Sequence, residues 1–174
     1  LSSLSRPSWP WFRDSQRRLL AEIGHTGMAV SLDRGDSLDV HPRRKADIGH
    51  RLCRWALNRD YGFDLLPSGP LFRSAEGKEG SVEVAFAYAE GLKAAEGDAI
   101  RGFELAGADC LFPPATATIH GNRVHLHSPE VPHPVHVRYA WAPFTRANLV
   151  NRDDLPASTF RAEIGTGISP QQQE

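Results

Sequence analysis

The sequence predicts an α/β fold class, with a short helical α/β part over residues 1–60 and an antiparallel β part over 61–165. Two observations lead to this division. Up to residue 60, apolar residues recur at helical spacing on either side of a short apolar run at 26–33. After Tyr61 the pattern changes to alternating runs separated by prolines, which is typical of short antiparallel strands.

The first helix is expected over residues 9–23, in WPWFRDSQRRLLAEI. Its apolar residues fall on one face, with charged residues opposite: Trp11, Phe12, Leu19, Leu20 and Ile23. Gly24 ends this helix, and TGMAVSLD at 26–33 is expected to form a buried strand. The loop RGDSLDVH then leads toward the second helix.

The second helix is expected to begin at Pro42, because the first turn of a helix tolerates the missing N–H of proline. An apolar stripe follows at i, i+4, i+7 and i+8, and it consists of Ile48, Leu52, Trp55 and Ala56. The helix is expected to end near 58–60. Helix, strand, loop and helix in this order are typical of an α/β layer, in which sites form at the carboxyl ends of strands.

The second part is expected to be a small antiparallel β-sandwich. SVEVAFAYA (81–89) and VHVRYAWA (135–142) alternate between apolar and other residues, and a hairpin is expected to turn at Gly121-Asn122. The tail at 166–174, GTGISPQQQE from Gly165 onward, is expected to be disordered.

Composition limits the possible partners. The 174 residues are 40% hydrophobic and carry a net charge of −1, so no overall field favours nucleic acid or an anionic membrane. No apolar run approaches the roughly 20 residues needed to span a bilayer. The two cysteines, Cys53 and Cys110, are interpreted as buried free thiols. No cofactor is indicated.

The candidate catalytic residues lie between the expected strand and the second helix. His41 is placed to act as a general base, because the nearby helix start would disfavour its protonated form. Asp39 or Asp36 could fix its tautomer, as the acid of a catalytic triad does. The alternative is that His41 caps the helix and the aspartates form a solvated turn. Ser37 lies in a G-D-S-L tetrad but is not favoured as nucleophile, since no oxyanion donors follow it.

Two other interpretations remain open. Four histidines occur within twelve residues and could bind a metal, although surface or interstrand positions are favoured: His125, His127, His133 and His136. The β part could instead be a carbohydrate-binding module, with Trp141 and Tyr139 as candidate contacts, although the face that they share could equally belong to the core. The basic run at Arg43, Arg44 and Lys45 is interpreted as solvated helix charge.

The order of several motifs resembles the C-terminal half of the sialate O-acetylesterase family. The blocks that carry this resemblance are WPWFRDSQ (9–16), TGMAVSLDRGD (26–36), DVHPRRK (39–45), RLCRWAL (51–57), YGF (61–63), SGP (68–70), GFELA (102–106), VRYAW (137–141) and LPASTFR (155–161). Together they extend over most of residues 9–161. The resemblance implies an SGNH-type hydrolase, with a flavodoxin-like three-layer α/β domain joined to β-sandwich parts.

The resemblance also implies a function. It suggests a serine carbohydrate O-acetylesterase, similar to sialate 9-O-acetylesterases, with His41 as the catalytic histidine and Asp39 as the acid before it. The family's early nucleophile block is not found in this chain, so the chain alone is expected to be inactive. An acetylated sugar is the expected substrate, and the missing N-terminal half or a second copy is a possible partner. A periplasmic or secreted location is suggested by the family.

Overall fold

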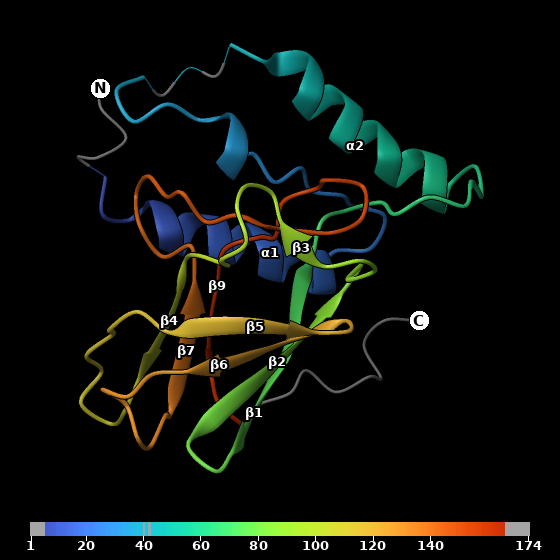
Figure 1. Cartoon of the computed structure of the whole chain (residues 1–174). Coiled ribbons are helices and arrows are strands. Elements are labelled where there is room, and N and C mark those ends of the chain that lie inside the picture. Colours follow the sequence, from blue (N-terminus) through green and yellow to red (C-terminus); the bar gives the residue numbers. More distant parts are fainter. Residues whose placement is uncertain (1–5, 40, 42, 166–174) are drawn as a thin grey trace.

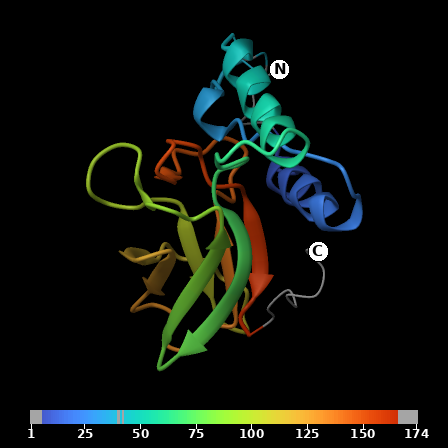
Figure 2. The same cartoon turned by 90° about the vertical axis from the view of Figure 1, so that its right-hand side faces the viewer.

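The structure is a computed structural model that describes residues 6–39, 41 and 43–165. Two helices lie at one end of three antiparallel sheets (Figures 1 and 2). The helical elements are α1 (Trp9–Glu22), the 3-10 turn η2 (Leu32–Arg34) and α2 (Lys45–Arg59). The strands are β1 (Leu71–Lys78), β2 (Ser81–Ala87), β3 (Lys93–Ala94), β4 (Phe103–Ala106), β5 (Thr116–His120), β6 (Arg123–His127), β7 (His136–Tyr139), β8 (Leu149–Val150) and β9 (Phe160–Glu163).

The two larger sheets share one hydrophobic core. One has the strand order β1-β2-β6-β5 and the other β4-β7-β9, while β3 and β8 form a separate pair. Alternate residues of each sheet point inward, and Phe72 of β1 stacks on Phe160 of β9 with ring centroids 4.4 Å apart. Fully buried Val84 and Leu105 come from opposite sheets and belong to the same cluster. The mixed α/β composition and the antiparallel second part agree with the sequence prediction.

The predicted hairpin is confirmed. β5 and β6 pair antiparallel with His120 opposite Arg123, so that Gly121 and Asn122 form the turn. Gly121 has φ of 60°, a left-handed conformation that glycine adopts without steric cost. The strands expected within 81–89 and 135–142 are also present, as β2 and β7. Strand β1, which the sequence analysis did not predict, completes the larger sheet as an edge strand.

The strand expected at 26–33 is not formed in the described residues. Residues 26–31 lie outside any ladder, and 32–34 form the 3-10 turn η2. A strand needs a neighbouring strand to bond to, and here the neighbour is helix α2. Side chains of α2 donate to three alternate carbonyl oxygens of this segment, those of Thr26, Met28 and Val30. The chain is therefore held alongside α2 through its carbonyl groups without sheet pairing.

Helix α2 begins three residues later than predicted. Its first residue is Lys45 and its N-terminal flanking residue is Arg44, which makes no side-chain capping bond. Pro42, the predicted start, lies outside the described residues. The end at Arg59 agrees with the prediction. His41 therefore lies four residues before the helix. The effect of a helix dipole is confined to the first turn of the helix. The position of His41 therefore does not support the predicted effect of the dipole on its ring.

Helix α1 has the predicted bounds within one residue, but its apolar face is not the buried one. Its buried residues are Pro10, Asp14 and Arg17, and the helix packs on β9. The apolar side chains remain about half exposed: Trp11 56%, Phe12 55%, Leu19 44% and Ile23 49%. Burying a charged pair while leaving an apolar stripe open is the reverse of what a surface helix normally does.

Two smaller expectations have different outcomes. Cys53 and Cys110 are free, as expected, but both are exposed, so the prediction of buried thiols is wrong. The tail at 166–174 lies outside the described residues. Within the part of the chain that the structure describes, neither helix is long and apolar enough to cross a membrane.

Candidate active site

The loop between η2 and α2 brings Asp39 and His41 together. Asp39 Oδ1 accepts a hydrogen bond from the main-chain N–H of His41 at 2.9 Å and lies 3.0 Å from Nδ1 of the same residue. Asp36, the alternative acid, accepts from the N–H of Leu38 at 2.8 Å. Both aspartates thus form tight turns of the kind that Asx side chains favour. Of these two aspartates, Asp39 contacts the ring of His41 in the structure.

The Asp39–His41 contact has the chemistry of an acid and base pair. The backbone hydrogen bond from His41, and then the bond from its ring, lower the pKa of Asp39 below its ordinary value. A carboxylate on Nδ1 leaves Nε2 as the nitrogen able to take a proton from a hydroxyl group. The His41 side chain is 86% exposed and that of Asp39 45%, so the pair is open to any partner surface.

A network of arginines and aspartates anchors the start of this loop to α2. Arg51 donates two hydrogen bonds to the carboxylate of Asp33, both at 2.7 Å. Arg34 donates to Asp47 of α2 at 2.5 Å, and this bond lowers the pKa of Asp47. The sequence analysis missed this network. Bidentate Arg–carboxylate pairs are geometrically specific, but partners 18 residues apart cannot be paired from spacing alone.

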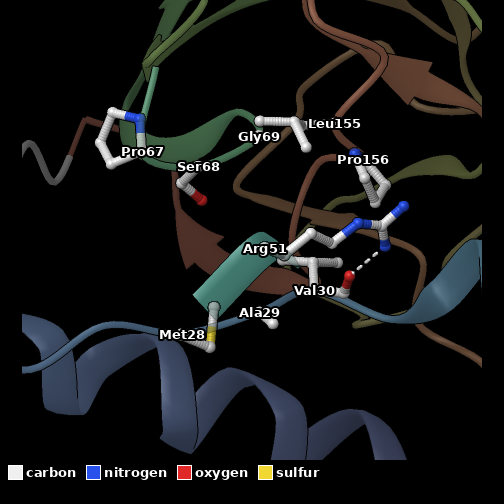
Figure 3. Close-up of a pocket in the computed structure, with 9 residues that line it drawn as sticks. All are labelled: Met28, Ala29, Val30, Arg51, Pro67, Ser68, Gly69, Leu155 and Pro156. Carbon is white, nitrogen blue, oxygen red and sulfur yellow. Dashed lines mark hydrogen bonds between the residues drawn. The ribbon is translucent and has the colours of Figure 1, made fainter. Parts of the chain in front are cut away.

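A small cavity lies where residues 28–30 and α2 meet the β part (Figure 3). Its lining residues come from three segments: Met28, Ala29, Val30 and Arg51; Pro67, Ser68 and Gly69; Leu155 and Pro156. Gly69 fits because a Cβ there would lie 2.1 Å from the carbonyl oxygen of Pro156. Neither Asp39 nor His41 lines this cavity. The cavity is therefore separate from the candidate pair, whose side chains are open to solvent.

The histidines of the β part do not assemble into a metal site. The His125 ring lies 2.7 Å from a carboxylate oxygen of Glu83 and 4.3 Å, centroid to centroid, from the His120 ring. Among the described residues, no group of three or more His, Cys, Asp or Glu side chains is placed to hold a metal ion. His125 therefore lies at an interstrand position, as the favoured interpretation expects.

The two candidate sugar contacts occupy different environments. Tyr139 is 1% exposed, and its hydroxyl oxygen accepts a hydrogen bond from the N–H of Leu149. Burial raises the pKa of Tyr139 well above its ordinary value. Trp141 follows a residue with positive φ, Ala140, and packs edge-on against Trp11 with centroids 4.9 Å apart. The shared face predicted for Tyr139 and Trp141 is absent, because the strand ends at Tyr139.

Comparison with known proteins identifies a similar solved structure. No protein-family model and no curated protein matches this chain. Among solved structures, the chain is similar to a carbohydrate acetylesterase from Xanthomonas citri, with 43% sequence identity and a TM-score of 0.85. The match covers 93% of this chain and 37% of the other, so this chain spans little more than a third of that enzyme.

This similarity supports a relationship with carbohydrate esterases. The similarity includes the sequence as well as the fold, because the identity is 43% in a match that covers 93% of this chain. The TM-score of 0.85 shows that the helices and sheets of the matched region have the same arrangement in the two structures. The remaining 63% of the acetylesterase has no counterpart within these 174 residues.

Proposed function

We propose that this chain is the histidine-bearing part of a carbohydrate O-acetylesterase, in which His41 is the general base and Asp39 the acid that orients it. The observation that carries the proposal is the similarity to the Xanthomonas citri acetylesterase over 93% of the chain. The contact between Asp39 Oδ1 and His41 Nδ1 at 3.0 Å supports the assignment of roles. The substrate class is an acetylated sugar, and a sialic acid bearing an O-acetyl group is the finer proposal.

The reaction is acyl transfer through a serine. The serine oxygen attacks the acetyl carbonyl while Nε2 of His41 takes the hydroxyl proton. The sugar oxygen then leaves with that proton, which produces the free sugar hydroxyl and an acetyl-enzyme. A water molecule attacks the acetyl-enzyme with the same histidine as base, and acetate is released. Asp39 remains ionised throughout and stabilises the imidazolium.

The nucleophile is proposed to lie outside these residues. Ser37 shares a short loop with His41, whereas nucleophile and base usually come from separate loops that face one carbonyl. We therefore assign residues 1–60 to the C-terminal segment of an SGNH-like α/β domain and 61–165 to a β-sandwich-like domain. The oxyanion donors of such an enzyme would also come from the part of the α/β domain not present here.

The test uses a chimera in which this chain replaces the matched segment of the Xanthomonas citri acetylesterase. We expect the chimera to release acetate from acetylated sugars. His41→Ala should lower kcat by about a thousandfold or more, because loss of a triad member removes proton transfer. His50→Ala is the matched control, since His50 is an exposed histidine of α2, and it should leave the rate unchanged.

A fluorophosphonate provides the second measurement, because it labels activated serines covalently. The isolated chain should gain no mass, whereas the chimera should gain one adduct outside this segment. An adduct that maps to Ser37 in the isolated chain would refute the proposed location of the nucleophile. Full activity of the His41→Ala chimera would refute the role of His41.

A further inference from the structure

A row of charged side chains crosses the outer face of the sheet β4-β7-β9, and the proposed reaction does not use it. Glu104 of β4 pairs with Arg138 of β7, and Arg138 pairs with Arg161 of β9 at directly opposite positions. The residues that alternate with these three in each strand pack into the core, so the three side chains face outward. Glu104, Arg138 and Arg161 are called the charged row below.

The charged row contains two cations and one anion. Arg138 forms a bidentate ion pair with Glu104, with nitrogen–oxygen distances of 2.8 and 3.2 Å. Among the described residues, the guanidinium group of Arg161 donates no hydrogen bond and forms no ion pair. The next outward-facing acid of β9, Glu163, lies opposite His136. Because like charges at opposite positions of two strands repel each other, the charged row favours one more anion beside Arg161.

Aromatic rings restrict the position of the Arg161 guanidinium group. Its Cζ atom lies 5.4 Å from the centroid of the Trp11 ring and 5.2 Å from that of the Phe112 ring. Figure 2 shows α1, which carries Trp11, beside β9. A cation–π contact holds a guanidinium group without neutralising its charge, and the N–H fork of that group fits the two oxygen atoms of a carboxylate.

Apolar surface beside Arg161 favours a sugar as the carrier of this carboxylate. Trp11 is 56% exposed, and Leu111, which precedes Phe112 in the chain, is 68% exposed. The C–H groups of a pyranose ring can pack against aromatic surface while its hydroxyl groups stay in water. The similarity to a carbohydrate acetylesterase supports the same ligand class, so the choice of a sugar rests on the proposed function.

We propose that Arg161 and Trp11 form a second sugar-binding site, in addition to the His41 site, for a sugar that carries a carboxylate on its ring. Uronic acids and sialic acids share this chemistry. Arg161 donates to both carboxylate oxygens, and Trp11 contacts the sugar ring. The two residues belong to β9 and α1, whereas Asp39 and His41 belong to the loop between η2 and α2. The second site therefore holds an acidic glycan without taking part in ester hydrolysis.

The first test measures sugar binding to the chimera by isothermal titration calorimetry. The acidic probes are tetragalacturonate and sialyllactose, and their neutral counterparts are the galactose tetrasaccharide of the same linkage and lactose. None of these probes carries an O-acetyl group. At least one acidic probe should bind about tenfold or more tightly than its neutral counterpart, because only the acidic sugar offers a carboxylate to Arg161. Equal binding of acidic and neutral probes, or equal binding of tetraglutamate, would overturn the proposal.

Two substitutions separate the guanidinium fork from overall charge. Arg161→Lys keeps the positive charge and should weaken binding of the acidic probe by about tenfold, because lysine lacks the fork. Arg123→Gln removes a charge from an arginine that is 48% exposed on β6 of the other sheet, and it should leave binding unchanged. Weaker binding in Arg123→Gln and unchanged binding in Arg161→Lys would show that overall charge determines affinity and would overturn the proposal.

The indole N–H signals in an NMR spectrum locate the site without any substitution. Addition of the tighter acidic probe to the isolated chain should shift the signal of Trp11. The signal of Trp55, whose indole donates to the Met28 carbonyl oxygen, should stay in place. A shift at Trp55 without one at Trp11 would overturn the proposal. Binding by the isolated chain but not by the chimera would do the same, because this face would then belong to an interface with the rest of the enzyme.

The second site and the proposed function can fail independently. The His41→Ala chimera should bind the acidic probe as tightly as the unmodified chimera. Binding by a chimera that releases no acetate would refute the proposed function and retain the second site. Acetate release by a chimera that binds no acidic probe would refute the second site alone.

Discussion

At the scale of single residues, the Asp39 carboxylate is the clearest electrostatic feature of the candidate site. Two hydrogen bonds from His41 favour the ionised form of Asp39. The bond from the main-chain N–H lowers the pKa of Asp39 more than the bond from the ring does. The backbone therefore holds the acid in place independently of the imidazole. This arrangement keeps a negative charge beside Nδ1 whether or not the ring is protonated.

This arrangement predicts an unequal response to removal of the ring. In His41→Ala the main-chain N–H remains, so the pKa of Asp39 should rise only part of the way to its ordinary value of about 3.9. Carbon-13 NMR of the side-chain carboxyl between pH 2 and 7 measures this pKa, with the urea-unfolded chain as the reference. A complete return to the unfolded value would mean that the ring provides the whole effect.

The sign of the pH dependence follows from this direction. Because folding lowers the pKa of Asp39, the ionised carboxylate favours the folded state above the unfolded pKa. That contribution is lost as the pH falls through the lower folded-state pKa. Asp47, whose pKa Arg34 lowers in the same direction, responds likewise. Both groups are solvent-exposed, so their effect on stability is small and screened by salt.

At the scale of elements, Arg51 joins the segment 26–34 to α2. Its side chain is 9% exposed and bonds the Asp33 carboxylate and the Val30 carbonyl oxygen. Arg51→Met should destabilise the fold by roughly 2 kcal/mol, because the Val30 carbonyl oxygen loses its donor and the partly buried Asp33 carboxylate keeps only its contact with Arg34 at 2.9 Å. The midpoint of urea unfolding measures this change.

Arg44→Met provides the control for Arg51→Met. Arg44 is 71% exposed and lies 3.8 Å from Asp47, so its removal should change stability by less than about 0.5 kcal/mol. Equal effects of the two substitutions would show that overall charge, and not the Arg51 contacts, determines stability.

The elements also show where sequence patterns suffice. Both helices and the 121–122 hairpin follow from local spacing and turn chemistry, and each is present. Strand β1 was missed because Glu76, Gly77 and Lys78 have low strand propensity, and its pairing with β2 is decided by tertiary contacts. The strand expected at 26–33 has the right pattern but no neighbour to pair with. The Asp39–His41 contact was within reach of the sequence, because the two residues are only two positions apart.

At the scale of the whole molecule, Arg13 of α1 connects the helical part to the β part. Its guanidinium group donates to the carbonyl oxygens of Ala140 at 2.9 Å and Ala142 at 2.7 Å, and to the Thr159 hydroxyl at 2.9 Å. Burial lowers the pKa of Arg13 to about 10. All of these acceptors are neutral, so Arg13 forms no ion pair with them. The planar guanidinium group can donate to all three acceptors at once, and lysine cannot reproduce this geometry.

Arg13→Lys should therefore loosen the helices without unfolding the sheets. The shared core of the two larger sheets contains no residue of α1 or α2, so it can remain intact when α1 detaches. Limited trypsin digestion should cut Arg13→Lys within the first 60 residues at least several times faster than the unmodified protein, while residues 61–165 remain protected. Arg18→Lys is the control, because Arg18 is 58% exposed and should leave the digestion rate unchanged. Simultaneous loss of both parts in Arg13→Lys would mean that the chain unfolds as one cooperative unit, which would contradict the proposed division at residue 60.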